Sequence, residues 1–114
     1  EAAAGLARER GTVVAVSGAV DHLTDGRRLV RIANGHPHLT RVTGAGCALG
    51  ALMAGFAAVE SDALLAATAA TALLTVAADQ AAPQAAGPGS FAVTLLDRLH
   101  DVQPTALAAA LRLV

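Results

Sequence analysis

Apolar residues fall into one short run near the amino terminus and two long uncharged stretches further along the chain. The short run, residues 13–18, reads Val-Val-Ala-Val-Ser-Gly. Its length and β-branched content are typical of a strand buried on both faces, as in a parallel sheet. The long stretches, residues 45–59 and 63–78, lack charged residues and are rich in alanine and leucine. They predict two buried helices, the first beginning near Ala45 or Gly46.

Further signals surround the short strand. Residues 2–10 are rich in alanine and are followed by Gly11, as in a helix that ends at a glycine C-cap. Asp25-Gly26 separates two runs of mixed apolar and polar residues, which is a strong signal for a β-hairpin. Residues 34–38, Asn-Gly-His-Pro-His, have the composition of a loop. The predicted order is therefore helix, strand, hairpin, loop, glycine turn and helices.

The second half of the chain is predicted to be helical scaffold. Asp62, or Ser61 before it, can cap a helix that begins near Ala63 and runs to about Ala82. Residues 83–89 then form a loop rich in proline and glycine.

Two shorter helices are predicted after this loop. The first places four apolar side chains at helical spacing, and these are predicted to be core: Phe91, Leu95, Leu96 and Leu99. Pro104 ends it, and residues 105–113 predict a last short helix.

Composition narrows the function classes. The chain of 114 residues is 54% hydrophobic and 15% charged, and its formal net charge of −1 argues against nucleic-acid binding, which needs a basic face. Both long apolar stretches are shorter than the roughly 20 residues of a membrane-spanning helix. We interpret them as buried helices of a cytoplasmic protein. The chain has one cysteine, which fits a reducing compartment.

The segment Thr43-Gly44-Ala45-Gly46-Cys47 carries the main chemical signal. Its two glycines permit a tight turn, and the helix that follows presents unpaired N–H groups with a partial positive charge of about half an elementary unit. Such an end binds anions, and it favours the thiolate form of a cysteine on the first turn. The pattern indicates chemistry on a phosphate, with the backbone around Gly44, Ala45 and Gly46 as the anion hole.

The same residues also have a purely structural interpretation. Gly-x-Gly is frequent in loops, and a single cysteine is often a small buried hydrophobic residue. The segment is not a Walker A loop, because Cys47 and Ala48 follow Gly46 where that motif needs Lys and Ser or Thr.

Other candidate residues leave alternatives open. His36 and His38 could supply two ligands of a metal site, but a third and a fourth would have to come from elsewhere in the chain. The resemblance of residues 34–37 to a loop of a known family favours a structural turn close to the active site. Asp21 could hold a turn or face phosphates through magnesium, and we favour the turn. No metal ligand is assigned.

Five motifs in this order resemble the hydroxyethylthiazole kinase family of the ribokinase-like superfamily. They lie at residues 14–21 (VAVSGAVD), 24–26 (TDG), 34–37 (NGHP), 42–47 (VTGAGC) and 87–91 (GPGSF), the last followed by Leu-Leu-Asp at 95–97. Most ribokinase-like enzymes have an aspartate at the position of Cys47, so the cysteine points to the thiazole kinase branch. Serine at 17 and alanine at 45 stand where the family often has threonine.

The resemblance implies an activity and roles for several residues. The reaction is magnesium-dependent phosphoryl transfer from ATP to the hydroxyl of 4-methyl-5-(2-hydroxyethyl)thiazole, in thiamine biosynthesis and salvage. Cys47 would be catalytic, Gly44 would bind the thiazole and Ser17 would bind the nucleotide. The family's enzymes are homotrimers with the substrate pocket at a subunit boundary.

The chain is much shorter than a complete ribokinase-like kinase. It opens at Glu1, inside a predicted helix. We therefore expect the carboxy-terminal part of a single kinase domain with a three-layer α/β/α fold, here helix, strand and hairpin followed by three or four helices. The magnesium site and the main thiazole pocket would lie in the absent half, so the fragment alone should be inactive. Two alternatives are another ribokinase-like small-molecule kinase and a non-catalytic helical interaction module.

Overall fold

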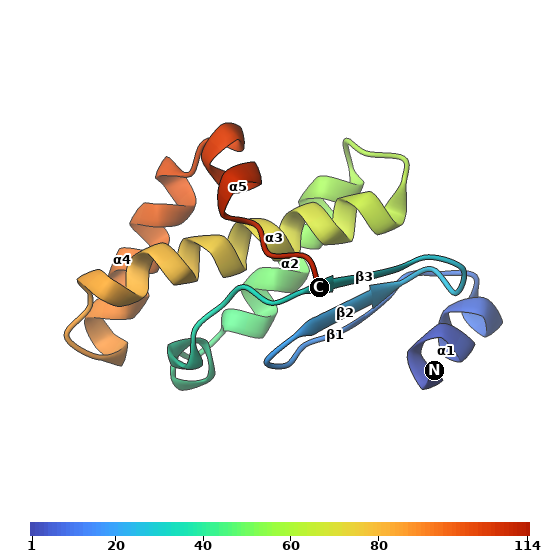
Figure 1. Ribbon diagram of the computed structural model, residues 1–114, viewed down its shortest axis with the longest axis horizontal. Coiled ribbons are helices and arrows are strands. Elements are labelled where there is room, and N and C mark those ends of the chain that lie inside the picture. The colour runs from blue at the N-terminus through green and yellow to red at the C-terminus, as the bar shows by residue number, and fades with distance from the viewer.

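The computed structural model describes residues 1–114 as a small antiparallel sheet packed against a layer of helices (Figure 1). Helix α1 (Ala2–Arg10) precedes strands β1 (Val14–Val16), β2 (Asp21–Thr24) and β3 (Leu29–Ile32). A 3-10 helix, η1 (Pro37–Arg41), leads to α2 (Ala45–Ala57) and α3 (Ala63–Ala81). A second, η2 (Ala82–Gln84), is followed by α4 (Pro88–Asp101) and α5 (Pro104–Ala110).

The predicted hairpin is confirmed, and its turn is built from the side chains that the sequence offers. The Asp25 carboxylate accepts hydrogen bonds from the backbone N–H groups of Arg27 and Arg28, at 2.9 and 2.7 Å. Gly26 has a φ of 91°, a conformation that strongly favours glycine. These bonds to charged and backbone donors hold the pKa of Asp25 well below its usual range.

Within residues 1–114, β1 does not have the expected surroundings of a strand buried in a parallel sheet. The sheet has the order β1-β2-β3, and both pairings are antiparallel. Strand β1 lies at the edge with one neighbour, so Val16 is 48% exposed, whereas Leu23 of the central strand is fully buried.

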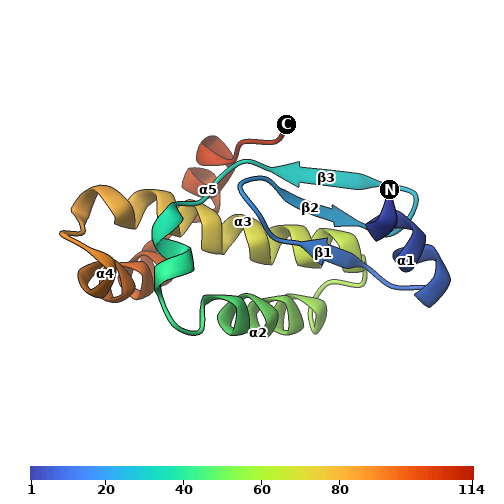
Figure 2. The same cartoon turned by 90° about the horizontal axis from the view of Figure 1, so that it is seen from below.

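Helix α3 runs through the middle of the molecule and joins two apolar clusters (Figure 2). One cluster lies between α3 and the sheet: Leu23, Ile32, Leu64, Ala67 and Ala72. The other lies between α3 and α4: Leu74, Ala77, Ala78, Ala81, Phe91 and Leu95. The small side chains of α3 allow its neighbours to approach closely, which explains the alanine-rich sequence.

The start of α3 follows the prediction. The Asp62 carboxylate accepts from the backbone N–H groups of Leu64 and Leu65 and pairs with Arg28 at 2.8 Å. Residues 63–84 are long and apolar enough to span a membrane by length and composition, but 61% of that apolar window is buried within the protein. The helix therefore has the burial of a core helix.

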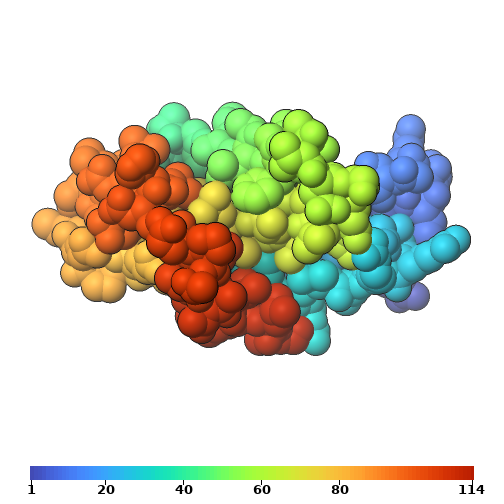
Figure 3. All heavy atoms as spheres, turned by 90° about the horizontal axis from the view of Figure 1, so that it is seen from above, coloured from blue at the N-terminus to red at the C-terminus, as the bar shows by residue number.

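Three sequence-based expectations about the helices are wrong. No residue of α2 is fully buried, because the helix packs chiefly on α3 alone. Leu96 is 68% exposed, since it lies on the outer side of α4. The last helix ends at Ala110 rather than at Leu113, because Leu113 pairs with Ile32 at the edge of β3. This terminal segment and α5 lie across α3 and reach the sheet (Figure 3).

Candidate functional site

The junction of Gly44 with α2 has the geometry that the sequence predicts. Gly44 is the N-cap, with a φ of 87° and a ψ of 4°, and its carbonyl accepts from the Ala48 N–H at 2.8 Å. The N–H groups of Ala45, Gly46 and Cys47 have no acceptor in the structure, and no side chain caps the helix. Three unpaired amides at the positive end of a helix of 13 residues attract an anion.

Cys47 lies on the first turn of α2 and is exposed. Within residues 1–114 its thiol is accessible, unlike that of a buried structural cysteine. The thiol and the free amides belong to the same helical turn, so a group bound by the amides would lie close to the sulfur.

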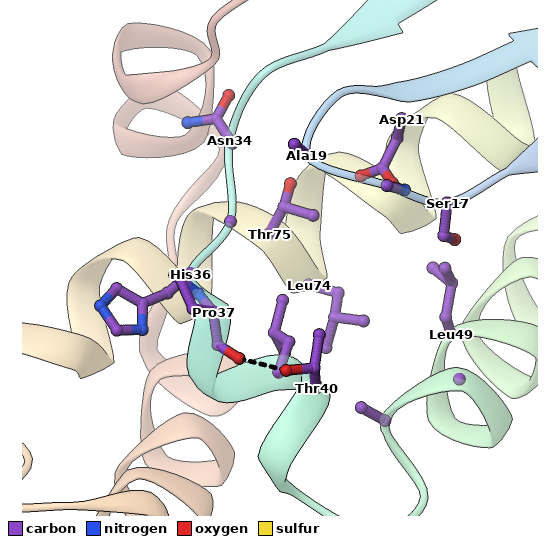
Figure 4. A pocket seen from close by; sticks show the side chains of 15 residues that line it. Ser17, Ala19, Asp21, Asn34, His36, Pro37, Thr40, Leu49, Leu74 and Thr75 are labelled. Atoms are coloured by element: carbon purple, nitrogen blue, oxygen red, sulfur yellow. Dashed lines mark hydrogen bonds between the residues drawn. The ribbon is translucent and has the colours of Figure 1, made fainter.

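A cavity of about 610 Å³ opens beside this helix start (Figure 4). Four segments line it: the β1–β2 turn, residues 34–40, the first turns of α2, and α3. From the first two come Ser17, Gly18, Ala19, Asp21, Asn34, Gly35, His36, Pro37, Leu39 and Thr40. The helices contribute Ala45, Gly46, Leu49, Leu74 and Thr75.

Only some of the predicted site residues line this cavity. Ser17, Ala45 and Gly46 all line it, although Ser17 is 28 residues before Ala45 in the sequence. Gly44 and Cys47 do not line it; they flank the two lining residues at the start of α2. The structure thus brings the predicted nucleotide-binding residue and two residues of the predicted anion hole to one cavity, and Cys47 directly follows them in α2.

Asp21 holds the turn that carries Ser17. Its carboxylate accepts a hydrogen bond from the Gly18 N–H at 3.0 Å, and the residue is 7% exposed. Burial raises the pKa of Asp21, while the bond from Gly18 and the nearby His22 act in the opposite direction. The hydrogen bond from Gly18 supports the interpretation that Asp21 holds the turn.

His36 and His38 form an aromatic cluster with Phe91. The two imidazole rings lie 4.7 Å apart, and their centroids are 6.0 and 5.4 Å from the Phe91 ring. The His36 Nδ1 atom accepts from the His38 N–H at 3.1 Å, which caps η1. The structure contains no group of three or more His, Cys, Asp or Glu side chains placed to hold a metal ion.

Sequence reasoning missed several residues at the cavity. Thr75 and Leu74 lie within α3, where the uniform apolar pattern gave no reason to distinguish them from core. Asp79, which bonds to Asn34 and Gly35 behind the cavity wall, was also missed. Its only sequence signal is that it is the first charged residue after Asp62 in a long apolar helix.

The fold and the site together define an α/β protein with an anion-attracting helix start at the edge of a cavity. The model of the hydroxyethylthiazole kinase family matches residues 1–105. The chain belongs to the hydroxyethylthiazole kinase family.

Relatives and a solved structure agree with this assignment. The chain is 61% identical over 113 residues to a hydroxyethylthiazole kinase of Clavibacter sepedonicus, covering 99% of the chain and 41% of that protein. It is 47% identical over 108 residues to a hydroxyethylthiazole kinase of Moorella thermoacetica, covering 95% of the chain and 40% of that protein.

The structure of a hydroxyethylthiazole kinase protein from Pyrococcus horikoshii OT3 superposes with a TM-score of 0.93 at 41% identity. The superposition covers 98% of this chain and 44% of the Pyrococcus horikoshii chain. The predicted fold, part of a ribokinase-like α/β/α architecture, is confirmed. The chain spans about two-fifths of the length of the curated relatives it matches.

Proposed function

We propose that the polypeptide containing this chain transfers the γ-phosphoryl group of ATP to the primary hydroxyl of 4-methyl-5-(2-hydroxyethyl)thiazole. This reaction belongs to thiamine biosynthesis and salvage. The observation that carries the proposal is the match of residues 1–105 to the hydroxyethylthiazole kinase family. The free amides at the start of α2 support it, because a transferring phosphoryl group spreads negative charge over its oxygens.

In the proposed reaction the hydroxyl oxygen forms a bond to the γ-phosphorus, and the bond from that phosphorus to the β–γ bridging oxygen breaks. ADP leaves with the electron pair. The N–H groups of Ala45 and Gly46, at the cavity lining, would stabilise the equatorial oxygens of the moving group. The Cys47 thiolate would accept the hydroxyl proton and become a thiol, a role worth about 10²- to 10⁴-fold in rate.

Ser17 and Gly44 complete the proposed assignments. The Ser17 hydroxyl belongs to the cavity lining near Leu49 of α2, where it would contact the nucleotide. Gly44 would contact the thiazole through its backbone. Because its φ of 87° favours glycine, the position presents the backbone with no side chain in the way.

Magnesium would accompany ATP, but these residues do not supply a site for it. Asp21 is the one carboxylate that lines the cavity, and its bond to Gly18 already occupies one oxygen. We derive no step through the metal here and place the acidic magnesium ligands in the remainder of the polypeptide. For the same reason we infer that the 114 residues alone are inactive. We also infer a cytoplasmic homotrimer for the intact enzyme, as the family resemblance implies.

The test is the kinase activity of the polypeptide that contains this chain, with variants at Cys47. The wild type should phosphorylate the thiazole alcohol with ATP. Cys47→Ala should lower kcat by about 10²-fold or more because no base accepts the proton. Cys47→Ser, which nearly preserves the shape of the side chain but is a much weaker base, should be similarly impaired. Cys47→Asp should retain activity, since a carboxylate acts as base in the wider superfamily.

The outcomes separate the competing functions. An unchanged kcat in Cys47→Ala removes the base assignment while leaving the reaction in place. Much faster phosphorylation of sugars or pyrimidines than of the thiazole supports another small-molecule kinase. A complete lack of nucleotide binding supports a non-catalytic helical module.

A further inference from the structure

One wall of the cavity is held from behind by a carboxylate that does not itself line the cavity. Asp79, in the last turns of α3, accepts from two consecutive residues of the wall. Its Oδ2 accepts from Asn34 Nδ2 at 2.8 Å, and its Oδ1 accepts from the Gly35 N–H at 3.0 Å. Each carboxylate oxygen of Asp79 therefore accepts one hydrogen bond from the wall.

The Asn34 side chain is fixed on its other side by the terminal segment. Its Nδ2 also donates to the Ala110 carbonyl at 2.9 Å, and its Oδ1 accepts from the Arg112 N–H at 2.6 Å. Asn34 is 4% exposed, so loss of any of these partners would leave a buried polar group unpaired. Asn34 therefore connects α3 with the segment that follows α5.

Arg112 closes this arrangement. Its guanidinium lies 3.3 Å from Asp79 and donates to the Ala33 carbonyl at 2.8 Å, while its own carbonyl accepts from the Ala33 N–H at 2.9 Å. Residues 110–114 lie beyond the part of the chain that the family model matches. The segment that follows α5 therefore supports the same wall as Asp79.

The supported residues are the ones that face the cavity. Gly35 has a φ of 120°, and a Cβ there would lie 3.7 Å from Leu39 and from Thr75. Gly35, His36 and Pro37 line the cavity, and η1 begins at Pro37 (Figure 4). The backbone at Gly35 therefore sets where the wall lies and where η1 begins.

We propose that Asp79 is a positioning residue, which acts together with Asn34 and Arg112 to hold the Gly35–Pro37 wall of the cavity. This inference rests on the proposed function only in taking the cavity as the site of a bound substrate. Asp79 does not line the cavity. It fixes the backbone of the wall through two hydrogen bonds, and its charge is balanced by Arg112.

The primary test compares Asp79→Asn with Asp97→Asn in the polypeptide that contains this chain. Asparagine keeps the shape of Asp79, but its amide must face one of two donors, so at least one bond to the wall is lost. Asp97 is exposed on α4 and makes no side-chain hydrogen bond or ion pair in the structure. Asp97→Asn therefore removes the same charge as Asp79→Asn without removing a contact. Asp79→Asn should raise the KM of ATP or of the thiazole alcohol about tenfold, with kcat changed less.

A second variant separates positioning from simple loss of stability. Asn34→Asp combined with Asp79→Asn exchanges donor and acceptor, because the new carboxylate at 34 can accept from the new amide at 79 while Gly35 keeps its acceptor. The double variant should reverse part of the rise in KM caused by Asp79→Asn, although it lacks the donor to Ala110. Hydrogen exchange of the Gly35 amide should be faster in Asp79→Asn than in Asp97→Asn.

The results distinguish this inference from the proposed function. If the wild type phosphorylates nothing, the proposed function fails, and exchange of the Gly35 amide still tests the support of the wall. If Asp79→Asn matches Asp97→Asn in both KM values and in Gly35 exchange, Asp79 is not a positioning residue. The same conclusion follows if KM stays unchanged while only thermal stability falls.

Discussion

Helices α2 and α3 have similar compositions and opposite surroundings. Of the 19 residues of α3, 12 are buried, whereas none of the 13 residues of α2 is. Helix α3 contacts β2, β3, α2, α4 and α5, while α2 packs chiefly on α3. The burial of an apolar helix is therefore decided by the number of its neighbours, and an apolar sequence alone does not reveal that number.

Because α2 has few neighbours, its outer side leaves apolar side chains uncovered. An apolar groove of about 540 Å³ runs between α2 and α4, lined by Ala48, Ala51, Leu52, Gly55, Phe56, Val59 and Leu99. Val59 is 85% exposed, which is unusual for a valine beside other apolar residues. Nothing within residues 1–114 covers this face, and the chain spans only about two-fifths of its relatives' length.

The two phenylalanines of the chain provide the strongest test of the difference in burial between α2 and α3. Phe91 is fully buried against α3, and Phe56 is half-buried on α2. Phe91→Ala should lower the free energy of unfolding by about 3–5 kcal/mol, through lost burial and a residual cavity. Phe56→Ala should cost about 1–2 kcal/mol. Urea denaturation of the polypeptide that contains this chain measures both, and equal losses would show that α2 is as enclosed as α3.

The sequence predicts the local signals of the fold well. Asp25-Gly26 marks the hairpin, Asp62 marks the start of α3, and Gly44 marks the start of α2, because each of these residues forms its bonds within a few positions of itself. Ser17, predicted through the resemblance of its motif, and Gly46, predicted from the glycine-rich helix start, both line the cavity, while their roles stay predictions. Long-range features were missed, since no local pattern contains them.

Three residues show why long-range features could not be predicted from the sequence. Leu113 leaves the predicted helix because it pairs with Ile32, which is 81 residues away in the sequence. Asp79 bonds to a wall 44 and 45 residues away. Leu96 follows the helical spacing of core residues but points outward, because α4 contacts α3 on one side only. Each outcome depends on tertiary neighbours that the sequence around the residue does not specify.

A second test enlarges one alanine on each helix. Ala77 is fully buried in the cluster between α3 and α4, and Ala54 is exposed on α2. Ala77→Leu should destabilise the protein by about 1–3 kcal/mol, because the close-packed interface has no room for three more carbons. Ala54→Leu should stay within about 0.5 kcal/mol of the wild type. A similar cost at both sites, measured by urea denaturation, would mean that Ala54 also faces a packed surface.

The smallest expected effect concerns how the two helices begin. Helix α3 has a charged cap, Asp62, whereas α2 begins at Gly44 without a side-chain cap. Hydrogen bonds from Arg28 and from the first amides of α3 lower the pKa of Asp62 to about 2. Because this pKa lies below the unfolded value of about 3.9, the carboxylate stabilises the fold above that value, and the contribution is lost as the pH falls through about 2.

Asp62→Asn isolates this charge, because asparagine still caps a helix but cannot form an ion pair with Arg28. The difference in Tm between wild type and variant should be constant above about pH 5 and should shrink as the pH falls from about 4 to about 2. In a nuclear magnetic resonance titration, the amide signals of Leu64 and Leu65 should shift with a midpoint near pH 2. Those of Gly46 should not, since no carboxylate bonds to the start of α2. A Tm difference that persists unchanged below pH 2 would show that the stabilisation comes from the shape of the cap and not from its charge.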